Sequence, residues 1–108
     1  RNLALAIRSY QETITAIRAL LVENGINFTK LILFGSVAKG LATDKSDIDL
    51  CVVFGGRVKG IEKLRRRASI LLCQNGYNVD VLATTSREFK ENMISPILHE
   101  VRTYGIEI

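Results

Sequence analysis

The sequence predicts an α/β (α+β) fold in which a small mixed β-sheet is flanked by helices. Apolar residues recur at helical spacing in one long N-terminal segment and one central segment. Three short apolar runs bounded by glycine or by Asn-Gly have the length of strands. The chain has 108 residues, which suits one domain with a modest core, so we expect a single domain over residues 1–108.

The first two elements are expected to be a long helix and a buried strand. Residues 3–23 place leucine and isoleucine on one helical face, and Asn24-Gly25 supplies the stop signal. Residues 31–34 are a continuous apolar run that ends at Gly35, which favours a buried strand.

A helical turn, a polar loop and a second strand follow. Residues 36–39 can form one helical turn, with Ser36 as its N-cap and Gly40 after its end. Residues 43–46 are polar and predict a loop. Residues 48–54 are the second strand, which Gly55-Gly56 breaks.

The last part of the chain predicts a helix, a strand and a further helix. Residues 61–74 carry an apolar stripe at helical spacing and end at Asn75-Gly76. Residues 77–83 alternate as a strand does. A final helix is expected to begin near Ser86 and to be interrupted or restarted at Pro96.

The composition excludes several classes of protein. Hydrophobic residues make up 47% of the chain and charged residues 24%, which is typical of a folded globular protein. No apolar run approaches the ~20 residues that span a bilayer, so we expect no membrane segment. Cys51 and Cys73 lie in apolar contexts without a CxxC spacing, which predicts two buried thiols and a reducing, cytoplasmic environment.

The formal net charge is +4, and a basic cluster at residues 63–67 supplies much of it. A basic balance allows a nucleic-acid partner. The chain has no Trp, three Tyr and four Phe, so it offers few aromatic rings on which bases could stack. A solvated helix face is therefore favoured over a nucleic-acid surface, and an acidic partner or a triphosphate ligand fits the charge equally well.

The pair Asp47 and Asp49 is the strongest candidate for chemistry. Residues two apart on a strand point to the same face, so both carboxylates leave the sheet together. Like charges that close raise a pKa, stay in water or hold a cation. Carboxylate oxygens without nearby His or Cys suit Mg²⁺ or Mn²⁺. Simple turn chemistry, with Asp47 capping the loop, is the alternative.

The position of Asp80 favours a metal site over simple turn chemistry at Asp47. It lies inside the strand predicted for residues 77–83, where a carboxylate that faces the core is costly unless it is paired or liganded. If that strand neighbours the strand at residues 48–54, Asp80 joins Asp47 and Asp49 on one face. The sequence therefore predicts a divalent metal site built from these carboxylates.

Gly35 and Ser36 supply a candidate phosphate site. They follow a strand and open a helical turn, so the N–H groups of Ser36 and Val37 are free to bind an anion, and Gly35 allows close approach. The segment "GSVAKGLA" is not a P-loop, because Leu41-Ala42 stands where Lys-Ser or Lys-Thr is required. A phosphate site beside clustered carboxylates predicts phosphoryl or nucleotidyl transfer.

These residues together resemble the DNA polymerase β nucleotidyltransferase superfamily. The matching parts are "ILFGS", then residues 37–46, then "DIDL", and later "VDVL". The pattern is similar to the "GSxARGxAxxxSDxDL" style of the minimal nucleotidyltransferases (MNT proteins), with Lys39 where Arg is usual. The order of elements and the closing "SPILHEVRTYGIEI" extend the likeness to most of the chain.

The resemblance implies a role for each matching residue. Gly35 and Ser36 would hold the β- and γ-phosphates of a nucleoside triphosphate, and Lys39 would contribute to nucleotide binding without the planar fork of Arg. Asp47 and Asp49 would carry two Mg²⁺ ions. Asp80 would complete the shell of the second ion or accept the proton of the attacking hydroxyl. The implied reaction transfers a nucleoside monophosphate, with AMP from ATP as the expected group, and releases pyrophosphate.

The resemblance also implies a partner. Small members of this family are commonly encoded beside an HEPN protein, a helical ribonuclease toxin, and act as antitoxins by adenylylating a toxin tyrosine or by binding the toxin. The expected acceptor is therefore a separate macromolecule. Two alternatives stay open: a non-catalytic antitoxin that acts by binding alone, and a nucleotidyltransferase that modifies RNA.

Overall fold

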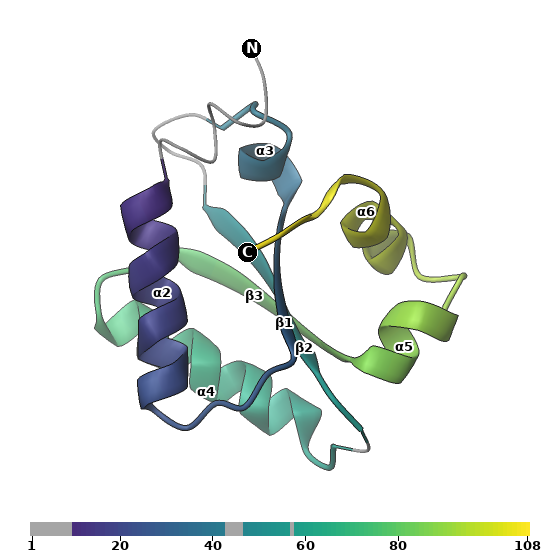
Figure 1. Ribbon diagram of the computed structural model, residues 1–108, viewed down its shortest axis with the longest axis horizontal. Coiled ribbons are helices and arrows are strands. Elements are labelled where there is room, and N and C mark those ends of the chain that lie inside the picture. Colours follow the sequence, from purple (N-terminus) through teal and green to yellow (C-terminus); the bar gives the residue numbers. More distant parts are fainter. Residues whose placement is uncertain (1–9, 43–46, 57) are drawn as a thin grey trace.

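The structure is a computed structural model, and it describes residues 10–42, 47–56 and 58–108. Along the chain, the helices and strands of the described part (Figure 1) are α2 (Gln11–Glu23), β1 (Lys30–Phe34), α3 (Gly35–Ala38), β2 (Ile48–Phe54), α4 (Ile61–Gln74), β3 (Val79–Thr85), α5 (Ser86–Glu91), α6 (Pro96–Tyr104) and β4 (Ile106–Glu107). Strands and helices thus mix along the chain, and the predicted fold class is confirmed.

The strands form one mixed sheet in the order β3-β2-β1-β4. β1 pairs antiparallel with both β2 and β4, whereas β2 and β3 are parallel and are joined through α4. A parallel pair needs a crossover of this kind, because its two strands start at the same edge of the sheet. The carboxyl end of β1 and the amino ends of β2 and β3 therefore meet at one edge.

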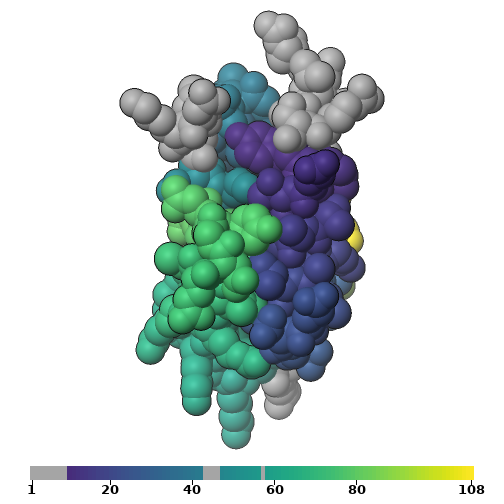
Figure 2. All heavy atoms as spheres, turned by 90° about the vertical axis from the view of Figure 1, so that its left-hand side faces the viewer, coloured from purple at the N-terminus to yellow at the C-terminus, as the bar shows by residue number. Residues whose placement is uncertain are grey.

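Helices cover both faces of the sheet. α2 and α4 lie on one side, and α5 and α6 on the other (Figure 1). Figure 2 shows the outer surface of the first side, where α2, in purple to blue, packs beside the teal-to-green part of the chain. The larger apolar cluster lies under α2 and α4 and includes Ile17, Leu33, Leu50, Val52 and Leu72. A smaller cluster under α5 and α6 consists of Ile32, Phe34, Cys51, Val53 and Val101.

Alternation along the strands explains this division. Leu50 and Val52 belong to the larger cluster, whereas their neighbours Cys51 and Val53 belong to the smaller one. Successive side chains of a strand point to opposite faces, so a strand with both faces covered is apolar throughout. Asp49 lies two residues before Cys51 and so points to the face covered by α5 and α6.

Several predicted elements agree with the structure. β2 and α4 have the predicted bounds, and β1 begins one residue earlier than predicted, at Lys30. The predicted helix at residues 3–23 is present as α2 from Gln11, while residues 3–9 lie outside the described part of the chain. The loop predicted for residues 43–46 also lies outside it.

The predicted cap of the short helix is wrong. α3 begins at Gly35, its N-cap position is Phe34, and no side chain caps it. Ser36 is therefore the second residue of the helix and cannot cap it. The helix ends at Ala38, one residue before the predicted Lys39, and Gly40 lies beyond its end, as predicted, with φ +72°, a conformation that favours glycine.

The C-terminal third of the chain differs from the prediction in two ways and agrees with it in a third. β3 lies two residues further on than predicted and ends at Thr85, because it pairs in register with all of β2. The predicted helix begins at Ser86 as α5 and restarts at Pro96 as α6, as expected, with Ser95 Oγ accepting from Leu98 N and Pro96 in the first turn. β4 was not predicted, since its two residues become a strand only by pairing with β1.

In the described ranges, no helix has the length and apolar character needed to cross a membrane.

The two cysteines occupy different environments. Cys51 is buried in β2, as predicted, and its burial raises the pKa of the thiol to about 12. Cys73 is exposed on α4, so the prediction of a second buried thiol is wrong. The apolar stripe of α4 passes through Leu72, which is fully buried, and the adjacent position faces solvent.

Thiol titration should distinguish these environments. Because the thiolate is the reactive form, Cys51 should not react with Ellman's reagent at pH 8 in the folded protein, whereas Cys73 should react at once. We expect one reactive thiol per chain in buffer and both in guanidinium chloride. Cys73→Ser is the control and should leave no fast-reacting thiol. A fast reaction in that variant would contradict the buried position of Cys51.

Candidate active site

Three of the predicted site residues, Gly35, Asp49 and Asp80, lie where three strand ends meet. Phe34, the last residue of β1, lies opposite Asp49 of β2, and Asp49 lies beside Asp80 of β3. Gly35 follows Phe34 directly and opens α3. The expectation that the Asp80 strand neighbours the Asp49 strand is therefore confirmed.

Gly35 is packed against the carboxylate of Asp49. Its φ of +72° is a conformation that side chains disfavour. A Cβ built on Gly35 would collide with Asp49 Oδ2 and lie 2.9 Å from Asp49 Cγ. Glycine is thus needed at this position for two reasons, the backbone conformation and the room for the carboxylate. The glycine and the aspartate, far apart in sequence, form one structural unit.

Asp49 carries the strongest electrostatic signal at the site. Its carboxyl group is half-buried, and its pKa is raised above the ordinary value of 3.8, first by burial and then by the negative charges of Asp80 and Asp47. Burial and the two neighbouring carboxylates therefore disfavour the ionised form of Asp49. A bound cation would relieve this repulsion.

Asp47 is held by a neighbour that the sequence did not single out. Asn78 Nδ2 donates to Asp47 Oδ1 at 2.8 Å, and Ile48 N donates to the carbonyl oxygen of Asn78 at 3.1 Å. Asp47 itself is exposed. Asn78 stands two residues before Asp80, a spacing that could have indicated it once the parallel pairing was known.

The environment of Asp80 differs from the prediction. The carboxylate was expected to face the core from mid-strand, but Asp80 is exposed and is the second residue of β3, the edge strand of the sheet. Its position beside Asp49 comes from the register of β2 and β3 and not from burial. The predicted burial of Asp80 is therefore wrong, whereas its predicted place beside Asp49 is confirmed.

A pocket of about 450 Å³ opens over these residues. Gly35, Asp49 and Asp80 are among its lining residues, and most of the others are apolar. The remaining lining residues are Phe34, Val81, Leu82, Pro96, Ile97 and Glu100. A pocket lined by both carboxylates and apolar side chains suits a ligand that has a charged part and an apolar part.

Lys39 contacts two residues of α6 beside the pocket. Its Nζ lies 2.7 Å from Glu100 Oε2 and 4.7 Å from the centre of the Tyr104 ring. Glu100 also lines the pocket, so the ion pair forms part of its rim. No local sequence signal indicated Glu100, because the contact joins segments far apart in the chain. Ser36 lies in the first turn of α3, where N–H groups have no acceptor within the helix.

These residues fit a divalent cation in donor type and charge. Carboxylate oxygens are the ligands that Mg²⁺ prefers, and the charges of Asp80 and Asp47 act on Asp49, whose pKa burial already raises. In the described segments, no three His, Cys, Asp or Glu side chains already converge as a ligand set. One oxygen of Asp47, Oδ1, accepts a hydrogen bond from Asn78.

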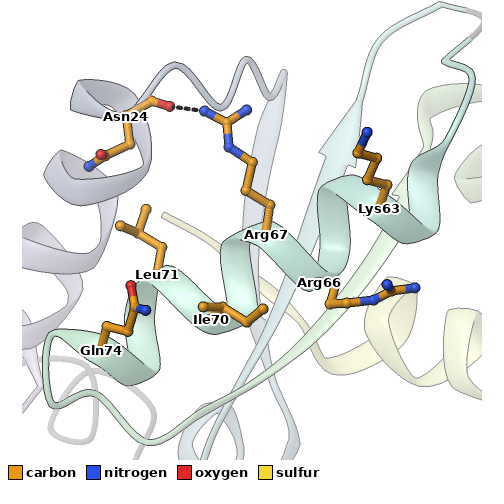
Figure 3. Close-up of a pocket in the computed structure, with 7 residues that line it drawn as sticks. All are labelled: Asn24, Lys63, Arg66, Arg67, Ile70, Leu71 and Gln74. Atoms are coloured by element: carbon orange, nitrogen blue, oxygen red, sulfur yellow. Dashed lines mark hydrogen bonds between the residues drawn. The ribbon is translucent and has the colours of Figure 1, made fainter.

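A second hollow, of about 400 Å³, lies on the opposite side of the sheet along α4 (Figure 3). Its lining includes Lys63, Arg66, Arg67 and Ile70, and Arg67 donates to the carbonyl oxygen of Asn24 at 2.6 Å. No carboxylate lines it. This hollow cannot hold a cation, and the pocket over Asp49 remains the candidate active site.

Comparison with known families agrees with this geometry. The model of the protein family described as "Nucleotidyltransferase domain" matches residues 14–104. The chain belongs to the nucleotidyltransferase domain family. The match includes every predicted site residue, and it confirms the family expected from the Gly-Ser and Asp-x-Asp motifs.

A curated relative and two solved structures are similar to this nucleotidyltransferase. A candidate protein adenylyltransferase of Methanocaldococcus jannaschii is 28% identical over 81 residues, 73% of this chain and 77% of the relative. The crystal structure of a candidate nucleotidyltransferase from Sulfolobus solfataricus has a TM-score of 0.65 at 20% identity, covering 99% of this chain and 86% of that one.

The second structure is a complex of tri-AMPylated Shewanella oneidensis HEPN toxin with MNT antitoxin. It has a TM-score of 0.56 at 23% identity, covering 90% of this chain and 69% of that chain. At these identities, the two structures show a shared fold.

Gly35→Ala should destabilise the nucleotidyltransferase more than a glycine substitution at a site with room. Gly56 has a similar φ of +67° and no atom within 4 Å of an added Cβ. Gly56→Ala should lower the free energy of unfolding by about 1 kcal/mol, from backbone strain alone. Gly35→Ala should cost about 2–3 kcal/mol, because Asp49 must also move. Urea denaturation measures both.

The excess cost should disappear when the carboxylate is absent. In an Asp49→Ala background, Gly35→Ala should cost no more than Gly56→Ala, since the colliding oxygen is gone. Equal costs of the two glycine substitutions in the wild-type background would contradict the packing of Gly35 against Asp49.

Asp49→Asn should stabilise the metal-free protein at neutral pH. A raised pKa means that the folded state binds the proton more tightly than the unfolded state, so stability falls as pH rises from 3.8 through the folded pKa. The asparagine side chain does not titrate, so the variant does not lose this part of the stability as the pH rises. Melting temperatures measured in EDTA should therefore differ at pH 7 and converge below pH 3.8. Glu23→Gln, at an exposed position of α2, should leave the pH profile unchanged.

Proposed function

We propose that this nucleotidyltransferase transfers AMP from ATP to a hydroxyl of a protein acceptor in a Mg²⁺-dependent reaction that releases pyrophosphate. The observation that carries the proposal is the packing of the Asp49 carboxylate between Gly35 and Asp80. It joins a glycine-led helical turn, suited to phosphate, with clustered carboxylates, suited to a cation.

Each predicted residue has a part in this reaction. Asp47 and Asp49 would hold two Mg²⁺ ions, which when bound neutralise charge on the triphosphate and lower the pKa of the attacking hydroxyl. Gly35 and Ser36 would bind the β- and γ-phosphates through backbone N–H groups. The acceptor oxygen bonds to the α-phosphorus, the bond from that phosphorus to the leaving pyrophosphate breaks, and Asp80 accepts the hydroxyl proton.

Lys39 would assist by binding the triphosphate. In the structure it pairs with Glu100 at the pocket rim, so it would exchange one anionic partner for another when the nucleotide enters. A lysine offers a single point charge where a planar Arg fork is usual, which favours a contact with one phosphate oxygen over a bidentate one.

The acceptor is proposed to be a tyrosine of an HEPN toxin, which makes the chain an antitoxin. Two similarities support this. The curated relative is named for protein adenylyltransferase activity, and one similar structure holds an AMPylated HEPN toxin with its MNT antitoxin. A reaction that consumes ATP also fits the cytoplasm, the reducing environment expected from the cysteines.

A second candidate function is modification of RNA. The observation in its favour is the basic lining of the hollow along α4, with Lys63, Arg66 and Arg67. That hollow lies on the other side of the sheet from Asp49, and no aromatic side chain lines it for base stacking. Protein therefore remains the favoured acceptor.

Calorimetric titration with ATP, GTP, CTP and UTP tests the nucleotide site. The wild-type protein should bind ATP only when Mg²⁺ is present. Asp47→Asn and Asp49→Asn should each weaken that binding by about tenfold or more, because each removes a ligand charge. Glu23→Gln, which removes an exposed carboxylate from α2, should bind as the wild type does.

Transfer is then measured with ATP labelled at the α-phosphate and a purified HEPN toxin as acceptor. Label on the toxin that is absent with Asp80→Asn supports the reaction. Mg²⁺-ATP binding without any label, together with inhibition of the toxin, would favour an antitoxin that acts by binding. If no nucleotide binds with or without Mg²⁺, the proposed reaction is wrong.

A further inference from the structure

The connection between α5 and α6 exposes an unusual amount of apolar surface next to the candidate active site. Met93 is 72% exposed, Ile94 is 91% exposed and Ile97 is 46% exposed. We call these residues the apolar ridge. They lie within five consecutive residues, at the turn before α6 and in its first turn. Single exposed apolar residues are ordinary, but a contiguous group marks a surface for interaction.

The apolar ridge is held in place from both ends. Asn92 Oδ1 accepts hydrogen bonds from Ile94 N and Ser95 N, each at 3.0 Å, and Asn92 Nδ2 donates to Glu88 Oε2 at 3.1 Å. Beyond the turn, Ser95 caps α6 and Leu98 is buried. Because the turn is fixed by side-chain hydrogen bonds, Met93 and Ile94 face water in a prepared position.

The ridge is continuous with the candidate active site. Ile97 and its neighbour Pro96 line the same pocket as Asp49 and Asp80. An acceptor hydroxyl must reach these carboxylates, so the macromolecule that delivers it must enter this pocket. Ile97 is the residue of the apolar ridge that such a macromolecule meets in the pocket, and Met93 and Ile94 precede it in the chain.

The chemistry of the ridge fits protein better than nucleic acid. The segment from residue 92 to residue 98 contains no charged side chain, and the pocket beside it carries Asp49, Asp80 and Glu100. A phosphate backbone would find no cation on the ridge and negative charge next to it. Aliphatic side chains of a protein would be buried there in contact with Met93 and Ile94.

We propose that the apolar ridge docks the protein acceptor, and that it selects a segment in which the hydroxyl-bearing residue is flanked by apolar side chains. This inference rests on the proposed adenylyl transfer to protein. It adds to it the class of acceptor sequence and the surface that recognises it.

Two synthetic peptides test this directly. Both carry fluorescein, lysines for solubility and a central tyrosine; in one the tyrosine is flanked by leucine and isoleucine, and in the other by serine. The test variant is Met93→Ser/Ile94→Ser. The matched control is Val22→Ser/Ile70→Ser, which removes two apolar side chains that are 58% and 50% exposed on α2 and α4. Circular dichroism establishes that both variants are folded.

Fluorescence anisotropy should show about tenfold tighter binding of the apolar peptide to the wild-type protein, since burying two large aliphatic groups accounts for a preference of that size. The test variant should lose the preference, and the control should keep it. Label transfer from ATP, measured on the same peptides, should follow the same order.

Several results would overturn the inference. In the anisotropy measurement, these are equal binding of the two peptides by the wild type or a preference that survives in the test variant. Binding of a labelled RNA 20-mer that is lost in the test variant would point to a nucleic-acid partner. A wild-type dimer that becomes a monomer in the test variant, measured by sedimentation, would point to a second copy of the chain. Failure of the proposed function would give a different set of results. In that case the apolar peptide binds through the ridge, but Mg²⁺-ATP does not bind and no peptide is labelled.

Discussion

The register that sets Phe34 opposite Asp49, and Asp49 beside Asp80, is the constraint on which the rest of this structure depends. A slip of one residue would turn Asp49 into the face packed under α4 and bring Leu50 to the pocket, because successive side chains alternate. The apolar residues that follow on β2 hold the register from both faces. The core thus determines where the carboxylates lie, although none of the aspartates belongs to it.

The same arrangement places Asp49, a destabilising carboxylate, on a strand that the apolar core holds in position. Burial and two neighbouring charges act against the ionised form of Asp49. A sequence selected for stability alone would not keep such a cluster, so its presence is best explained by a ligand that carries positive charge. Lys39 and Glu100 need no added ligand to balance their charges, because each is already paired with the other in the folded chain.

Much of the fold and the site could be predicted because their signals are local. The Gly-Ser turn, the Asp-x-Asp spacing, β2 and α4 are each encoded within a few residues of sequence. Contacts between distant segments could not be predicted: the hydrogen bond from Asn78 to Asp47, the proximity of Glu100 and Lys39, and the pairing that creates β4. The exposure of Asp80 was missed for a related reason, since only the strand order shows that β3 is an edge strand.

The sheet order also bears on how the chain is made. β1 is completed on one side by β2 soon after it is synthesised, but its other partner, β4, lies at Ile106–Glu107. During vectorial synthesis one edge of this apolar strand therefore lacks its partner until every intervening element has left the ribosome. An unpaired strand edge invites pairing with foreign chains. This edge of β1 is thus the last part of the sheet that can be completed, and it lies on the opposite side of that strand from the aspartates.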